Sequence, residues 1–203
     1  MDKLPVEVMP LSWLIGSWVG VGLGTYPTIE DFRFGQEVVF SCDGRPFINY
    51  VSRSWLLDEE GERIKPLAIE SGYWRPQPDN NVELLLAHPN GVAEIYVGTT
   101  EVLGLDDAKI TSARAVLKTD VVTRTESAKP YTQGERLYGL FDSQLVWTFD
   151  MAAMGQPMQN HLSAKLRPAV EDLLLPWRPD RGKTDYASKA FALPRNGNSC
   201  LSR

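Results

Sequence analysis

Glycine occupies every second position from Gly20 to Gly24, and Val19, Val21 and Leu23 fall between the glycines. Two residues is the period of a β-strand, so the glycines line one face of a strand and the apolar side chains line the other. Bare backbone on one face is costly, and its usual reasons are a sharp bend at a barrel corner or the close approach of a bulky group. An ordinary glycine-rich first strand is the other explanation that these residues allow. The spacing excludes a dinucleotide-binding fingerprint, because no strand–helix–strand pattern follows it.

Strand-like segments recur along the chain after Phe34, and turn-forming residues separate them. The clearest turn is Asn90-Gly91, a strong hairpin signal between two strand-like segments. No convincing amphipathic helix interrupts the series. We therefore predict an all-β protein, an antiparallel up-and-down barrel of roughly ten strands, which is wide enough to hold a ligand. The strands predicted after the glycine strand cover residues 36–40, 47–56, 67–74, 82–87, 92–97, 109–118, 135–141, 145–152 and 159–166.

The pattern of the chain changes after Arg167. A short apolar run, Leu173–Trp177, is followed by polar sequence with scattered basic residues. The 203 residues are enough for one domain with a substantial core, and residues 10–15 allow a helical turn before the first strand. We therefore predict a barrel domain over residues 1–167 and a C-terminal extension over residues 168–203 that is partly disordered.

Charge and composition exclude several classes of protein. The net charge of −5 argues against nucleic acid or an anionic membrane as a partner. The two cysteines, Cys42 and Cys200, are too few for a disulfide framework, and no zinc-binding spacing of cysteine and histidine exists. There is no Gly-x-Ser-x-Gly nucleophile motif. Neither a signal peptide nor a transmembrane segment is visible, so the cytoplasm is the expected location.

Two histidines are the main candidates for chemistry. His88 comes directly before Pro89-Asn90-Gly91, and we interpret it as a solvated turn residue. His161 lies within the last predicted strand. A lone histidine in a strand is more often a hydrogen-bonded structural residue than a ligand, and the spacing leaves both roles open.

If side chains alternate strictly along this strand, His161 lies on one face of it and a stripe of apolar residues lies on the other face. The stripe consists of Leu162, Ala164 and Leu166, which would point outward if His161 points into the barrel. Such patches are seldom left bare. We therefore predict that Leu173–Trp177 folds back over the stripe, or that a second subunit covers it in a homodimer.

Two further residues would attract no attention on their own. Lys129 lies in a predicted loop, where a lysine normally faces solvent, and Thr28 follows the glycine strand, where its hydroxyl could cap a turn.

Several motifs taken together resemble the nitrobindin family. They cover residues 16–22, 26–29, 44–47, 70–75 and 156–162, in the order of the chain. The family consists of small ten-stranded barrels of the fatty-acid-binding-protein type that hold haem b. The resemblance therefore implies ferric haem as the cofactor, peroxynitrite isomerisation to nitrate as the activity, and nitric oxide as a second ligand.

The resemblance also implies roles for individual residues. His161 matches the proximal haem ligand, and Thr28 and Lys129 match haem-contacting residues of the family. A hydroxyl and an ammonium group both suit haem propionates, which need donors and positive charge. Two alternatives stay open: a non-enzymatic carrier of an apolar ligand, and a nitric oxide sensor or carrier.

The chain departs from the family pattern at two positions. Cys42 and Ala68 stand where many members carry histidine. The sequence therefore predicts a mostly apolar lumen with no imidazole opposite His161, and a haem whose sixth coordination position is open or holds water. Cys42 is no substitute, because the neighbouring Asp43 disfavours its thiolate form.

Overall fold

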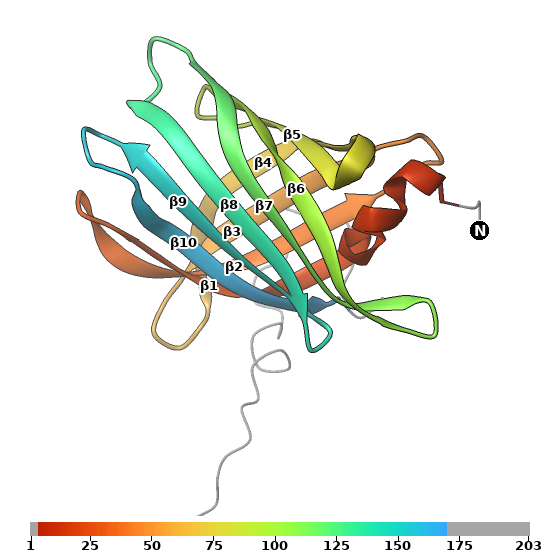
Figure 1. The fold of residues 1–203 in the computed structure, drawn as a ribbon. Helices are drawn as coiled ribbons and strands as arrows, with labels where there is room; N and C mark the ends of the chain where they lie inside the picture. The colour runs from red at the N-terminus through yellow and green to blue at the C-terminus, as the bar shows by residue number, and fades with distance from the viewer. Residues whose placement is uncertain (1–3, 170–203) are drawn as a thin grey trace, which may run out of the picture.

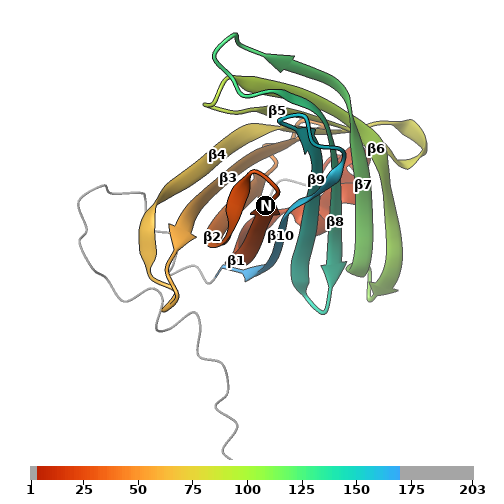
Figure 2. The ribbon, with the colours of Figure 1, turned by 90° about the vertical axis from the view of Figure 1, so that its left-hand side faces the viewer.

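The computed structural model describes residues 4–169 as one closed antiparallel barrel. Its ten strands pair in chain order, and the ring closes where β1 pairs with β10 (Figure 1). Figure 2 shows the ring from the end of the molecule that lies at the left in Figure 1. The predicted fold class is confirmed. The strands are β1 (Gly16–Tyr26), β2 (Ile29–Ser41), β3 (Ile48–Leu57), β4 (Arg63–Pro76), β5 (Asn81–Ala87), β6 (Val92–Asp106), β7 (Lys109–Arg124), β8 (Tyr131–Phe141), β9 (Gln144–Ala153) and β10 (Gln159–Pro168).

Most strands extend beyond their predicted bounds. The hairpin of β6 and β7 is the longest, since it continues to a turn at Asp107 and Ala108, both with positive φ. β10 runs to Pro168, and the Ala169 amide donates a hydrogen bond to the Ser17 carbonyl oxygen at 2.8 Å. The predicted extension lies, from residue 170 onward, outside the described residues.

A 3₁₀ helix, η1 (Val6–Leu14), lies at one end of the barrel (Figure 1). Val8, Leu11 and Leu14 are fully buried and three residues apart, which is the period of this helix type. Together with Trp13 they belong to the same apolar core as the strands. The second helix, η2 (Pro78–Asn80), is a single turn between β4 and β5. No helix that the structure describes is long and apolar enough to cross a membrane.

Up-and-down connectivity divides the loops between the two ends of the barrel. The connections after β2, β4, β6 and β8 lie at the end that carries η1. The connections after β1, β3, β5, β7 and β9 lie at the other end, which we call the mouth. Residues far apart in sequence, such as those near 28, 88, 129 and 161, therefore share one end of the molecule.

The glycine face of β1 points into the barrel, between buried Trp18 and buried Tyr26. Phe34 and Phe32 are the cross-strand partners of Gly22 and Gly24. A Cβ atom at Gly22 would lie 2.2 Å from Cζ of Phe34, and a Cβ atom at Gly24 would lie 2.1 Å from Cζ of Phe32. The close approach of a phenyl ring is therefore the reason for Gly22 and for Gly24. At Gly20 the close neighbour is the backbone of β10, because a Cβ atom there would lie 2.2 Å from the Lys165 carbonyl oxygen.

Candidate functional site

His161 lies at a β-bulge close to the mouth. Asn160 pairs with Asp150 and Leu162 pairs with Phe149, so His161 is an extra residue on β10 without a counterpart on β9. A bulge breaks the alternation of side chains and is a common way of re-aiming one residue. Because of the bulge, the side chain of His161 can contact the lumen although Leu162, the next residue, faces inward as well.

The bulge makes the predicted orientation of the apolar stripe wrong. Leu166 and Ala164 are buried in the core, and Leu162 packs against it. All three therefore face the lumen rather than the outside. The reason for a covering segment or second subunit over this stripe is gone, and Leu173–Trp177 lie outside the described residues.

The ring of His161 is half-buried among aromatic side chains. The ring centroids of Tyr26, Phe149 and Phe32 lie 5.4, 6.1 and 6.3 Å from its own, all in edge-on arrangements. Its Nδ1 lies 3.0 Å from the Thr25 carbonyl oxygen. A carbonyl oxygen only accepts, so Nδ1 carries the proton and the lone pair of the neutral ring is on Nε2.

These surroundings suit a metal-binding imidazole. Burial lowers the pKa of His161, although the hydrogen bond to Thr25 acts in the opposite direction. The neutral form is the one that binds a metal, and a second hydrogen bond that fixes the tautomer is the usual companion of a histidine ligand. The aromatic ring neighbours add an apolar wall of the kind a porphyrin needs. His161 would therefore be suited to hold a haem iron through Nε2.

Thr28 and Lys129 are both exposed and both belong to loops at the mouth. Thr28 sits in the turn between β1 and β2, and Lys129 sits in the loop between β7 and β8. The Met154 amide donates to the Pro130 carbonyl oxygen at 2.9 Å, which ties the Lys129 loop to the connection that precedes β10. The fold thus brings these residues to the same end as His161.

Cys42 belongs to the opposite end of the barrel, just after β2. It is half-buried, and its Sγ lies 3.5 Å from the Arg45 carbonyl oxygen. It is therefore not part of the site. Ala68 pairs with Ser54 on the lumen-facing side of β4, near the mouth.

The interpretation of His88 as a solvated turn residue is wrong. Its side chain is only 15% exposed, and its Nε2 lies 2.6 Å from Oε2 of Glu94. The prediction that no imidazole lies opposite His161 is also wrong, because His88 enters the lumen at the mouth from the far side of the ring. The sequence contained a signal: Val82, Leu84 and Leu86 are buried, and alternation continues the inward face to His88.

The lumen is polar in its middle, where a mostly apolar interior was predicted. Arg136 on β8 is buried and binds Glu70 on β4 through two parallel hydrogen bonds of 3.0 and 2.9 Å. Its Nε donates to the Tyr96 hydroxyl at 3.1 Å, and Tyr96 donates to Glu94 at 2.6 Å. We call the set Glu70, His88, Glu94, Tyr96, Tyr131 and Arg136 the lumen network.

Both carboxylates of the lumen network are held in the charged form. Burial by itself would raise the pKa of Glu94, but the hydrogen bond from His88, the charge of Arg136 and two tyrosine hydroxyls lower this pKa to about 2. Burial likewise opposes ionisation of Glu70, and the charge and hydrogen bonds of Arg136 overcome it, so that its pKa is lowered. No local sequence pattern predicts this network, since its members are spread over three strands and a turn.

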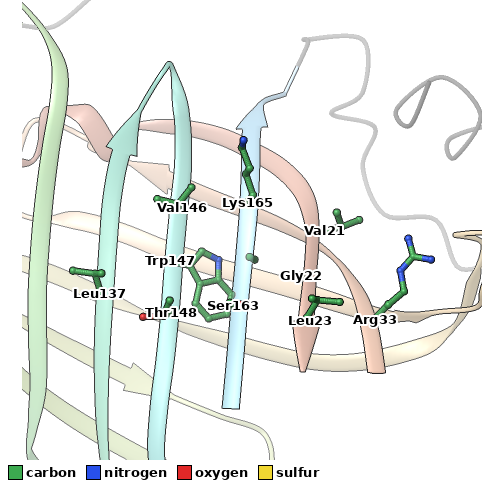
Figure 3. A pocket seen from close by; sticks show the side chains of 11 residues that line it. Val21, Gly22, Leu23, Arg33, Leu137, Val146, Trp147, Thr148, Ser163 and Lys165 are labelled. Carbon is green, nitrogen blue, oxygen red and sulfur yellow. The ribbon is translucent and has the colours of Figure 1, made fainter. Parts of the chain in front are cut away.

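A separate hollow of about 520 Å³ lies on the outer wall of the barrel. Its side chains include Val21, Leu23 and Lys165, which alternate with inward-facing residues of β1 and β10 (Figure 3). None of His161, Thr28 and Lys129 lines it. The hollow is therefore distinct from the site at the mouth.

Comparison with known proteins agrees with this geometry. Residues 7–167 match the family described as "THAP4-like, heme-binding beta-barrel domain". A protein named "Peroxynitrite isomerase" from Nocardioides sp. is 48% identical over 165 residues, which cover 81% of this chain and 94% of that protein. A "Ferric nitrobindin-like protein" from Kineococcus radiotolerans is 42% identical over 178 residues, covering 80% and 93% of the two chains. The crystal structure of Rv2717c from M. tuberculosis superposes with a TM-score of 0.75 at 37% identity, covering 83% of this chain and all of that one. The chain belongs to the THAP4-like haem-binding β-barrel family, as the resemblance to nitrobindins predicted.

Proposed function

We propose that this protein binds ferric haem b through Nε2 of His161 and isomerises peroxynitrite to nitrate. The observation that carries the proposal is the hydrogen bond between Nδ1 of His161 and the Thr25 carbonyl oxygen, which leaves Nε2 free inside an aromatic wall. Relatives named "Peroxynitrite isomerase" with 43–48% identity over most of the chain support the reaction. When bound, ferric haem supplies a Lewis-acidic, redox-active iron for the rearrangement.

Different residues at the mouth would contact different parts of the haem. His161 would hold the iron, and the rings of Tyr26, Phe32 and Phe149 would keep water away from that side. Thr28 and Lys129 would meet the propionates with a hydroxyl donor and a positive charge. Thr28 and Lys129 are both exposed, so propionates that reach solvent at the mouth could contact them.

The lumen network argues against a carrier of fatty acids. A buried carboxylate ligand needs a cation. Among residues 4–169 the buried cationic side chain is that of Arg136, which already pairs with Glu70 at 2.9 Å and approaches Glu94 at 3.9 Å. A fatty acid would have to displace an internal carboxylate. The lumen is thus better suited to haem, whose charged groups stay at the mouth.

A haem titration of the purified protein and of His161→Ala tests the proposal. The wild-type protein should develop a Soret band with one equivalent of haem and accelerate peroxynitrite decay, whereas His161→Ala should not retain haem. Cys42→Ser, at the other end of the barrel, is the control and should behave as the wild type. An unaltered Soret spectrum in His161→Ala would show that the iron ligand is wrongly assigned.

Three further parts of the proposal have their own measurements. Nitric oxide is a second ligand, because an accessible haem iron binds it, and optical titration measures its affinity. A homodimer stays a prediction that no longer has the apolar stripe as its basis, and mass in solution tests it. A cytoplasmic location is measured by fractionation of cells.

A further inference from the structure

His88 is a largely buried imidazole that has no role in the proposed binding of haem. It follows β5 directly, and its amide donates to the Val92 carbonyl oxygen at 2.9 Å, so the backbone at His88 still pairs with β6. Alternation from buried Leu84 and Leu86 directs the side chain into the lumen. His88 therefore belongs to the lumen-facing wall at the mouth of the barrel.

Glu94 fixes the orientation of this imidazole. Its side chain is 2% exposed, and its Oε2 lies 2.6 Å from Nε2 of His88. The other oxygen, Oε1, accepts hydrogen bonds from the hydroxyls of Tyr96 and Tyr131. A carboxylate held in the charged form only accepts, so Nε2 of His88 carries a proton and the ring cannot turn freely.

Nδ1 of His88 is the unused nitrogen. Oε2 of the Glu70 carboxylate lies 3.7 Å from it, which is too long for a hydrogen bond. Among the described residues, Nε1 of Trp74 is the one buried side-chain nitrogen or oxygen atom that lacks a hydrogen-bond partner. Nδ1, which also makes no hydrogen bond, is therefore accessible rather than sealed.

His88 and His161 lie on opposite walls of the barrel. Four strands separate β5 from β10 in either direction around the ring, and both histidines lie at the mouth. Contacts join the two walls: Tyr131 donates to Glu94, and its ring centroid lies 6.4 Å from that of Phe149, which lies 6.1 Å from His161. A ligand held on the lumen side of His161 therefore meets the wall that carries Nδ1 of His88.

We propose that His88 is the acid–base residue of the lumen at the mouth, with Nδ1 as the atom that exchanges a proton with the bound ligand and Glu94 as its positioning residue. The inference rests on the proposed haem-dependent function. Peroxynitrous acid entering the site loses its proton to Nδ1: the O–H bond breaks, an N–H bond forms, and the peroxynitrite anion keeps the electron pair. The same N–H then donates a hydrogen bond to the anion, and the proton later leaves to solvent.

Cyanide binding to the ferric holoprotein tests this role without turnover. Hydrogen cyanide must lose its proton to bind as cyanide, so a positioned base accelerates association. His88→Leu should slow cyanide association at least about tenfold, since general acid–base groups typically contribute more than that. Haem affinity should stay unchanged, because His161 is intact. His88→Gln fills the position with a polar side chain that cannot act as a base, and should be equally slow.

Two more variants separate a local effect from a general one. Glu94→Gln should slow association less than His88→Leu does, because the imidazole remains but its orientation is weakened. Ser54→Ala removes a hydroxyl on the lumen side of β3, which donates a long 3.4 Å hydrogen bond to the Ala68 carbonyl oxygen. It is the matched control and should stay within about twofold of the wild-type rate.

Each remaining outcome overturns the inference. Unchanged cyanide kinetics in both His88 variants, with normal haem affinity, would remove His88 from the chemistry and leave the haem-binding proposal standing. A low-spin ferric spectrum that becomes high-spin in His88→Leu would make His88 an iron ligand instead of a proton acceptor. A wild-type protein that binds no haem would overturn both this inference and the proposed function.

Discussion

Arg136 and Glu70 join opposite sides of the barrel through two parallel hydrogen bonds, Nη1 to Oε1 at 3.0 Å and Nη2 to Oε2 at 2.9 Å. The two residues belong to β8 and β4, which are not neighbours in the sheet. The guanidinium carbon also lies 4.6 Å from the ring centroid of Phe149, whose ring neighbours His161. The ion pair therefore helps to hold Phe149, the ring against which His161, the proposed haem ligand, packs.

Removing the cation from this pair should be strongly destabilising. Arg136→Met leaves two buried carboxylates without their cation, and breaking a buried pair in this way typically costs about 3–5 kcal/mol of unfolding free energy. Urea denaturation at neutral pH measures the unfolding free energy of the variant and of the wild type. The control is Arg75→Met, because Arg75 and Glu83 form an exposed pair (52% and 34%) that should contribute no more than about 1 kcal/mol. Equal losses in the two variants would contradict a special role for the buried pair.

The charged state of Glu94 predicts a loss of stability in acid. The pKa of Glu94 is lowered from 4.5 to about 2, so its contribution is complete above the unfolded value and disappears as the pH falls through the folded value. Between pH 7 and pH 3 this amounts to a loss of about 2 kcal/mol. Urea denaturation of the wild type and of Glu94→Gln at both pH values isolates the contribution. An equal pH dependence of the two proteins would refute the assignment.

The glycine face of β1 should tolerate no added side chain where the phenyl rings lie. A Cβ atom at Gly22 would be 2.2 Å from Cζ of Phe34 and 2.5 Å from the Ser163 carbonyl oxygen. Gly22→Ala should therefore cost about 1–3 kcal/mol, as overpacking of a core does. Gly139→Ala is the control, because the nearest atom there would be 3.4 Å away and the strand backbone needs no glycine. Melting temperatures measure both, and a smaller loss at Gly22 than at Gly139 would count against the packing argument.

Lys129 should contribute modestly to haem binding through its charge. An exposed ammonium group beside a propionate is worth up to about 1 kcal/mol, so Lys129→Ala should weaken haem affinity by up to about fivefold, and less at high salt. Haem titration at two ionic strengths measures this effect. Lys118→Ala removes an exposed lysine in the middle of β7 and serves as the control. Identical affinities of the two variants at low salt would exclude a propionate contact.

The sequence alone determined the class of the fold, because strands and turns are local. The alternation of Gly20 to Gly24, the Asn90-Gly91 hairpin and the regular spacing of turns predicted the antiparallel barrel that the structure has. The motifs around residues 16–22, 70–75 and 156–162 were sufficient to indicate the haem-binding family. Alternation also predicted which face of β1 is bare, although it could not show that Phe32 and Phe34 cover it.

The tertiary structure decided which side chains face the site. The bulge at His161 exists only through the pairing of β10 with β9, and no alternation within β10 could show that Leu162, Ala164 and Leu166 face inward. The role of His88 depends on Glu94 and Glu70, which reach it only when three strands lie side by side. Arg136 binds Glu70, which lies 66 positions away in the sequence. Bulges and buried ion pairs depend on partners distant in the chain, so their positions follow from the closed barrel and not from the local pattern.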